Sequence, residues 1–361
     1  MATLKMDSSK IIDNIIKLQK YLSSQGIEWT LVTKMFNGYK AALEKIITHE
    51  CMKDLHSVGD SRVSNLRIIK DIKPDIVTMY IKPPALNQAK NVIRYADISL
   101  NSSYRTLEAL NREAGIAGKI HRVIIMIEMG ELREGIIRDN ILSFYEKVFS
   151  LENIQVIGIG TNLGCMYGVE PTYDKLIQLS LYKQLIEARF QRKLELVSSG
   201  SSITLPLIAS KKVPKGVNHF RIGETAFLGV SPLNNKQFRN LSTNTFEFSA
   251  EILELEKKNV VPDGNIGEGA IGQTAVLNYE ESEQKQSYRC IADFGEIDVD
   301  VNNLSLKDKK IKFIGSTSDM TVYDLGNDKG NYKVGGQIQF RPNYMSVARL
   351  MNSRYMSKQI I

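Results

Sequence analysis

Eight short apolar runs recur between residues 29 and 224, and each is followed by a polar turn and a helix-like stretch. The runs cover residues 29–34, 55–58, 75–81, 96–100, 122–128, 154–160, 193–199 and 220–224. Runs this apolar are typical of strands in a parallel sheet, whose two faces are both covered. Eight such units in about 200 residues predict a parallel (β/α)8 TIM barrel.

A doubly wound open sheet is the main alternative for alternating strands and helices. That fold carries a glycine-rich fingerprint after its first strand. Residues 32–40 read VTKMFNGYK, which lacks that fingerprint. A further helix is predicted over residues 7–26, with Asp7, Ser8 or Ser9 as N-cap and Gly26 as its stop. The barrel remains the favoured fold.

The pattern changes from about residue 241, where apolar and polar residues alternate. Such stretches occupy residues 245–256, 287–291 and 310–314, separated by Pro, Gly, Asn and Asp. Period-2 alternation predicts strands with one buried face. We therefore expect a barrel domain over residues 7–240 and a mostly β domain over residues 241–361. We expect a short strand at residues 3–6 to belong to the β domain.

Composition excludes several classes of protein. The 47 basic and 40 acidic residues give a net charge of +7, but the basic residues are spread along the chain rather than clustered. This argues against nucleic-acid binding, which uses a local patch, and it suits small anionic ligands such as phosphate esters. No apolar run approaches the ~18 residues of a membrane span, and the N-terminus has no signal-peptide core. We expect a soluble cytoplasmic protein.

The cysteines and histidines give no sign of a disulfide framework or a metal site. Cys51, Cys165 and Cys290 are far apart and form no CxxC pair. None of the four histidines stands in an HxH or HExxH spacing, which disfavours a metal-dependent barrel hydrolase. No bound metal is expected.

Polar residues follow the apolar runs, where a barrel places its active site. They are Lys34, Gly59, Asp60, Asn101, Ser102, Arg133, Thr161, Asn162, residues 199–202, Arg221 and Gly223. A lysine at the barrel mouth is partly desolvated, which favours the neutral amine needed for a Schiff base. The alternative for Lys34 is an exposed strand-end lysine. Likewise, SSGSS at 198–202 is either a phosphate-binding loop or a plain turn.

Six segments in one order carry a resemblance to a known family. They are WTLVTK (29–34), IEMGELREGI (127–136), GIGTNLGC (158–165), SSGSSITLPL (198–207), NHFRIGETAFLG (218–229) and GSTSDMTVYDL (315–325). Together they resemble the alanine racemase family, fold type III of the pyridoxal-phosphate enzymes, and most closely its ornithine racemase branch.

The resemblance implies a role for each matched barrel residue. Lys34 corresponds to the lysine that binds pyridoxal 5'-phosphate and acts as acid and base on one face. Arg221 corresponds to the arginine that contacts the pyridine nitrogen, and Arg133 to the one near the phenolic oxygen. The other matched positions are Ser201, Ser202 and Gly223 at the phosphate, and Thr161 and Asn162 beside the ring.

Two departures from the family pattern concern the phosphate and the second base. The family has Asn where this chain has Ser201. It also has a catalytic tyrosine, reaching across a dimer interface, where FGEIDVD (294–300) here carries Glu296. We expect Glu296 or Asp319 to serve the face opposite Lys34, and Asp298, Ser318 and Asp319 to contact the substrate. The alternative is that these residues are solvated surface groups.

The resemblance therefore predicts a homodimeric racemase acting on ornithine or another basic amino acid, since carboxylates suit a side-chain ammonium. An alanine or broad-specificity racemase is the first alternative. A decarboxylase of the same fold type is disfavoured because no CDG-like motif is present. A pyridoxal-phosphate carrier is disfavoured because such proteins end after the barrel.

Overall fold

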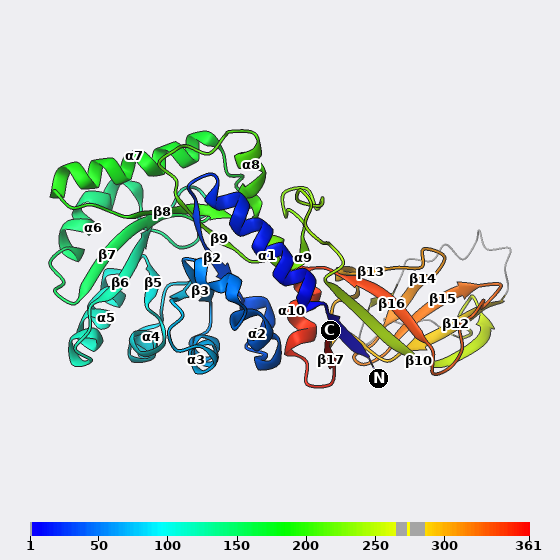
Figure 1. The fold of residues 1–361 in the computed structure, drawn as a ribbon. Coiled ribbons are helices and arrows are strands. Elements are labelled where there is room, and N and C mark those ends of the chain that lie inside the picture. The colour runs from blue at the N-terminus through cyan, green and yellow to red at the C-terminus, as the bar shows by residue number, and fades with distance from the viewer. Residues whose placement is uncertain (1, 265–272, 275–285) are drawn as a thin grey trace. The chain divides into compact units, whose positions relative to one another are not determined.

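The computed structural model describes residues 2–264, 273–274 and 286–361. The chain divides into two compact units, Ser9–Thr243 and the combination of Met1–Ser8 with Asn244–Ile361. Each unit has its own hydrogen-bonded sheet (Figure 1).

The first unit is a closed barrel of eight parallel strands in the order β2 to β9, which confirms the predicted fold. The strands are β2 (Glu28–Val32), β3 (Ser57–Asp60), β4 (Thr78–Tyr80), β5 (Ile98–Asn101), β6 (His121–Met126), β7 (Ile154–Gly160), β8 (Leu196–Ser201) and β9 (His219–Ile222). Each overlaps one of the eight apolar runs. The barrel closes where β2 pairs with β9, in a register that sets Leu31 opposite Ile222.

Helices surround these strands (Figure 1). They are α1 (Ser8–Ser23), α2 (Lys40–Ile47), α3 (Val63–Ile72), α4 (Ala89–Tyr95), α5 (Tyr104–Ile116), α6 (Ile141–Val148), α7 (Tyr173–Phe190), α8 (Leu205–Ala209) and α9 (Glu224–Leu228). The predicted N-terminal helix is α1, whose apolar positions Ile11, Ile15 and Leu18 are buried. Among the described residues, no helix combines the length and apolar character needed to cross a membrane.

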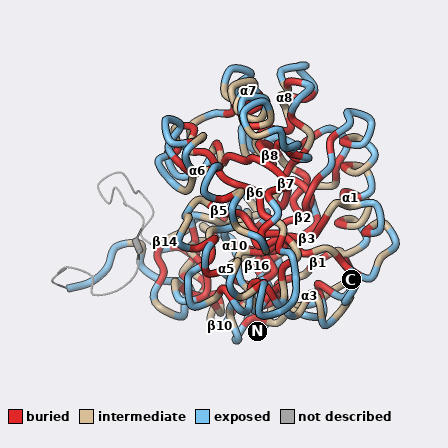
Figure 2. The backbone as a smooth tube through the Cα atoms, turned by 90° about the vertical axis from the view of Figure 1, so that its left-hand side faces the viewer, coloured by how far each residue is buried: buried red, intermediate tan, exposed pale blue. Residues whose placement is uncertain are grey.

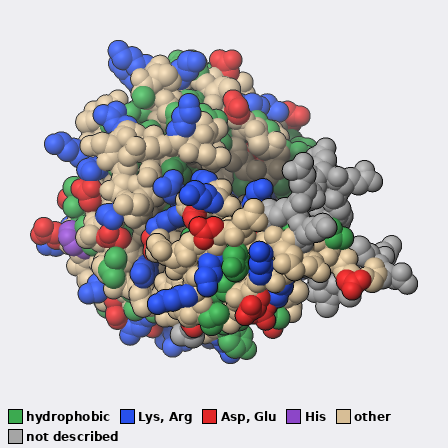
Figure 3. All heavy atoms as spheres, turned by 90° about the vertical axis from the view of Figure 1, so that its right-hand side faces the viewer, with side chains coloured by type: hydrophobic (Ala, Val, Ile, Leu, Met, Phe, Trp, Pro, Cys, Tyr) green, Lys and Arg blue, Asp and Glu red, His purple; other side chains and the backbone are tan. Residues whose placement is uncertain are grey.

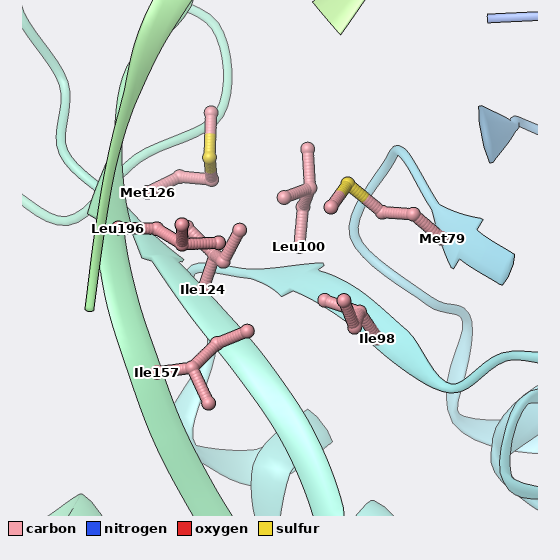
Figure 4. Close-up of a cluster of buried hydrophobic side chains, with 7 residues drawn as sticks. All are labelled: Met79, Ile98, Leu100, Ile124, Met126, Ile157 and Leu196. Atoms are coloured by element: carbon pink, nitrogen blue, oxygen red, sulfur yellow. The ribbon is translucent and has the colours of Figure 1, made fainter. Parts of the chain in front are cut away.

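Buried backbone is concentrated in the strands (Figure 2). One part of the barrel core is apolar and draws on five consecutive strands, β4 to β8. Its members are Met79, Ile98, Leu100, Ile124, Met126, Ile157 and Leu196, and their side chains point toward one another in Figure 4. Ile98 and Leu100 are two residues apart on β5, so they share one face of the strand.

A second part of the core is polar and comes from β2, β3, β8 and β9. Its members are the buried residues Thr30, Ser57, Ser198, His219 and Arg221. Thr30 links the two parts, because its Oγ1 atom lies 3.7 Å from the sulfur of Met79. The apolar cluster provides the packing energy, while the polar residues must satisfy one another by hydrogen bonds.

The second unit is built on a nine-stranded sheet in the order β11-β14-β15-β12-β10-β1-β17, with β16 pairing to β10 and β13 pairing to β16. The strands are β1 (Thr3–Met6), β10 (Phe246–Asn259), β11 (Gln273–Thr274), β12 (Gln286–Ala292), β13 (Leu304–Leu306), β14 (Lys312–Ser316), β15 (Thr321–Gly326), β16 (Gln337–Pro342) and β17 (Ser357–Ile360); its helix is α10 (Tyr344–Asn352). The N-terminal strand β1 pairs with β10. On the face drawn in Figure 3, Lys and Arg side chains are interspersed with Asp and Glu.

Candidate active site

Lys34 begins a 3-10 turn, η1 (Lys34–Phe36), directly after β2. Its side chain is exposed, so the expected partial desolvation is not found. The turn lies beyond the last residue of the strand, Val32, and within it Met35 and Phe36 are buried whereas Lys34 is exposed. Lys34 is therefore an exposed residue just beyond the end of β2.

A buried carboxylate holds the residue before Lys34. Thr33 donates from Oγ1 to Oδ2 of Asp60 over 3.1 Å, and Asp60 is 1% exposed. Asp60 also accepts from the backbone amide of Arg62 and from Nδ2 of Asn65. Burial raises the pKa of Asp60, and these hydrogen bonds act against the rise. The end of β3 thus anchors the backbone from which Lys34 projects.

Arg221, on β9, is buried with 7% exposure, and its guanidinium donates to four neutral oxygen acceptors. Its Nη1 donates to the carbonyl and to Oγ of Ser198, and its Nη2 donates to the carbonyl of Thr161 and to Oδ1 of Asn162, both over 2.7 Å. Burial lowers the pKa of Arg221 to about 10, an effect that Glu134 opposes and Arg133 reinforces. The guanidinium therefore remains protonated at neutral pH.

Glu134 links the two predicted arginines. Its carboxylate accepts from Nε and Nη2 of Arg133 and from Nδ2 of Asn162. Burial acts to raise the pKa of Glu134, but the hydrogen bond and charge of Arg133 hold it below its ordinary range. Asn162 in turn contacts Arg221, so Arg133, Glu134, Asn162 and Arg221 form one network. We did not predict Glu134, although it stands beside Arg133 in the segment IEMGELREGI.

The loop that carries Arg133 is tightly held. Glu131 is 2% exposed and accepts from the backbone amides of Cys165, Tyr167 and Val169, each over 2.9 Å. Arg133 also donates to the sulfur of Cys165. Gly135 has φ +147°, and a Cβ there would lie 2.3 Å from a backbone nitrogen, so only glycine fits. The loops after β6 and β7 are therefore joined through a buried carboxylate that sequence reasoning missed.

The predicted phosphate residues lie at the ends of β8 and β9. Ser202 accepts from the backbone amide of Thr225 over 3.2 Å, which leaves its own hydroxyl hydrogen free to donate. The amide of Ser201 donates to Oγ1 of Thr204. A Cβ at Gly223 would lie 2.8 Å from the carbonyl oxygen of Val32, so the chain passes this point without room for a side chain.

Glu224 follows Gly223, and its carboxyl group interacts electrostatically with the charge of Lys34. Burial raises the pKa of Glu224, and Lys34 works against that rise. Closure of the barrel between β2 and β9 produces this proximity. The sequence offered no signal for it, because the two residues follow the first and last strands of the barrel, β2 and β9, and are far apart along the chain.

The four predicted residues of the β domain lie on two neighbouring turns. The amide of Glu296 donates to the carbonyl of Thr317, and its carboxylate accepts from Ser316. Asp319 is exposed and accepts from Ser318 over 3.2 Å.

Asp298 differs, because it is 9% exposed and accepts from the amide of Gly295 and from Oγ of Ser353. The structure thus brings Glu296, Ser318 and Asp319 together at one edge, and it engages Asp298 in the domain's own hydrogen bonds.

Known proteins resemble this chain over most of its length. The profile of the family "Alanine racemase, N-terminal domain" matches residues 6–232. An ornithine racemase from Acetoanaerobium sticklandii is 32% identical over 99% of both chains, and a lysine racemase from Thermotoga maritima is 28% identical over 98% of this chain and 97% of its own.

Among solved structures, the alanine racemase from Streptomyces coelicolor has a TM-score of 0.72 at 14% identity, covering 100% of this chain and 98% of that one. At this identity the likeness shows the fold alone. The profile covers more than half of the chain, and the Acetoanaerobium sticklandii relative matches it from end to end. The chain therefore belongs to the alanine racemase family, whose matched relatives are isomerases.

Proposed function

We propose that this protein is a pyridoxal-phosphate-dependent racemase that interconverts the L and D forms of a basic amino acid, with ornithine the first candidate. The observation that carries the proposal is the pairing of β2 with β9. It sets the exposed Lys34, just beyond the end of β2, beside β9, whose next-to-last residue is the buried Arg221.

The residues at the rim fit the proposed cofactor. Arg221 is a buried cation that donates to Asn162, and Asn162 in turn donates to Glu134. Gly223 has no side chain, so the backbone after β9 can pass close to Val32 of β2. The hydroxyl of Ser202 has a hydrogen that it can donate to an anion. A planar ring with an attached phosphate matches this donor set.

When bound, pyridoxal phosphate would supply an electron-withdrawing ring that acidifies the α-proton of an amino acid joined to it. Lys34 is the residue that would hold the aldehyde carbon, and its Nζ would remove or return a proton on one face. The exposed position of Lys34 leaves space for the substrate at the rim.

Arg221 would limit how far the ring withdraws electrons. A guanidinium with a pKa of about 10 keeps its proton at neutral pH, so Arg221 would donate to a ring nitrogen without giving that proton up. The weaker electron withdrawal would favour return of the α-proton over competing reactions such as transamination.

The opposite face needs a second proton-transfer group, and we propose Glu296 or Asp319 of a partner subunit in a homodimer. Their support is chemical, since the family's tyrosine is missing and these carboxylates lie on neighbouring turns. An exposed carboxylate such as Asp319 also suits the side-chain ammonium of ornithine or lysine. The two relatives named as ornithine and lysine racemases support a basic substrate.

The test of the cofactor is covalent trapping. Holoprotein reduced with borohydride should carry the coenzyme on Lys34, as located by peptide mass spectrometry, and a Lys34→Ala variant should not. Loss of optical rotation should then be measured with L-ornithine, L-lysine, L-alanine and L-serine. Label on another lysine, or no racemisation of any of the four, would overturn the proposal.

The test of the second base is exchange of the α-proton. Glu296→Gln and Asp319→Asn variants should lose α-deuterium exchange from one enantiomer more than from the other. Unchanged exchange from both enantiomers would show that neither residue is the second base. Co-expression of Lys34→Ala with the impaired variant should restore activity if each site draws on two subunits. No restoration would contradict the shared site.

A further inference from the structure

A chain of hydrogen bonds runs from Arg221 through the polar part of the barrel core. Oγ of Ser198 accepts from Arg221 and lies 2.7 Å from Nδ1 of His219. The other ring nitrogen of His219, Nε2, lies 3.0 Å from Oγ1 of Thr30. Ser198, His219 and Thr30 are all 0% exposed. No water is needed to connect the arginine at the rim with the first barrel strand.

The direction of these bonds follows from the number of hydrogens. Ser198 has one hydroxyl hydrogen and already accepts from Arg221, so that hydrogen goes to Nδ1 of His219. A neutral imidazole carries one N–H, which must then be on Nε2. His219 therefore accepts from Ser198 and donates to Thr30.

A second proton on the ring would break this order. Nδ1 would become a donor, and Oγ of Ser198 would face two donors with no acceptor for its own hydrogen. Burial lowers the pKa of His219 well below its ordinary value, and the charges of His56 and Arg221 lower it further. The ring thus stays neutral and keeps its acceptor toward Ser198.

We infer that His219 is a positioning residue for Arg221, acting through the hydroxyl of Ser198; the inference rests on the proposed function, in which Arg221 contacts the cofactor. With His219 as its acceptor, the Ser198 hydroxyl cannot rotate, and its lone pairs stay directed at the guanidinium. Without that acceptor the Ser198 hydroxyl could rotate, so its lone pairs would no longer be held toward the guanidinium and the bond from Arg221 would weaken.

The barrel offers a matched control in His121. This histidine is also the first residue of a strand, is 4% exposed, and lies 2.8 Å by Nε2 from Oγ of a buried serine, Ser99. Its contact with Ser99 lies outside the chain of hydrogen bonds that leads to Arg221. Replacing it removes a comparable buried ring and serine contact.

The first experiment measures binding of pyridoxal phosphate and the absorbance spectrum of the bound form. His219→Leu and Ser198→Ala should each weaken binding about tenfold, the effect of one lost hydrogen bond to a charged group. They should also shift the absorbance maximum. Their effects should not add in the double variant, because both cut the same chain.

His121→Leu should keep the wild-type affinity and spectrum, and His219→Gln, which retains an acceptor oxygen, should recover part of both. Additive effects, or a His219→Leu variant that behaves like His121→Leu, would overturn the inference. Ser198→Ala makes the smaller change and carries the test if His219→Leu does not fold.

The second experiment does not need the cofactor. The chain has four histidines, so ¹⁵N-histidine NMR of the full-length protein can be assigned by elimination with His219→Gln. We expect His219 to carry its proton on Nε2 at neutral pH. A doubly protonated ring or a proton on Nδ1 would overturn the inference, whereas failure to bind pyridoxal phosphate would overturn the proposed function and leave this result standing.

Discussion

Arg221 donates from Nη2 to Oδ1 of Asn162 over 2.7 Å, and the same amide donates from Nδ2 to Glu134. One asparagine thereby joins a buried cation to a carboxylate that also pairs with Arg133. The side-chain amide of Asn162 has an acceptor oxygen and a donor nitrogen, so the oxygen binds the cationic Arg221 and the nitrogen binds the anionic Glu134. Glu134 in the loop after β6 and Asn162 in the loop after β7 thus supply the negative charge and the acceptor that suit Arg221 on β9.

The charge of Glu134 should stabilise the fold in a pH-dependent way. Although burial opposes it, Arg133 holds the pKa of Glu134 below its ordinary 4.5. A carboxyl whose pKa is depressed by folding contributes stability above its unfolded pKa, and that stability is lost as pH falls through the folded pKa. Glu134→Gln should lower Tm at neutral pH, and the gap should shrink below pH 4.5.

Thermal unfolding followed from acid to neutral pH checks this expectation. Glu254→Gln is a suitable control, because Glu254 pairs with Lys258 at an exposed site where an ion pair contributes little. A Tm gap for Glu134→Gln that stays constant at acid pH would contradict the assignment.

Glu131 should be essential for order in the loop after β7. Glu131→Ala leaves the amides of Cys165, Tyr167 and Val169 without their acceptor, which should cost about 3 kcal/mol of unfolding free energy. Urea denaturation measures the loss, and hydrogen exchange should show faster exchange at these three amides. Unchanged protection there would show that another group holds the loop.

His121 should contribute to acid sensitivity. Burial lowers its pKa to about 4 from an ordinary 6.5. Between these values the unfolded chain binds a proton at His121 that the folded chain does not, so stability falls as pH drops through this window. His121→Asn should lose stability less steeply from pH 6.5 to 4 than the unmodified protein. Urea denaturation measures the unfolding free energy at each pH. If it falls equally steeply in the variant and in the unmodified protein, other groups than His121 cause the acid sensitivity.

Cys165 should be the first thiol to react with an alkylating reagent. Its side chain is exposed, whereas Cys290 is buried and Cys51 is half-buried. Burial raises the pKa of both Cys51 and Cys290 to about 11, which keeps them as unreactive thiols. Mass spectrometry after brief iodoacetamide treatment at mildly alkaline pH should find label on Cys165 first. Cys165→Ser should abolish the fast phase, and equal labelling of all three would refute this.

Local sequence patterns were enough to predict the barrel. Each strand is a short apolar run bounded by polar residues. Because such a run is apolar at nearly every position, its own sequence indicates that both faces of the strand are buried. The same logic located Lys34 at the end of β2 and Arg221 on β9, because a strand end is visible in sequence. The short strand β1 was also found, together with its membership of the second sheet.

The environment of those residues could not be read in the same way. Lys34 was expected to be partly desolvated and is exposed, because exposure depends on the turn that follows the strand. Glu134 and Glu131 stood within a recognised segment, yet their partners lie on another loop. Periodicity carries no information about such partners.

What the sequence determined by itself was the succession of strands and helices and the family to which its motifs belong. Tertiary structure decided which polar groups satisfy one another, and the contact of Ser198 with His219 and Arg221 shows why. Hydrogen bonds inside a closed barrel join strands through register, and register is set only when β9 returns to pair with β2.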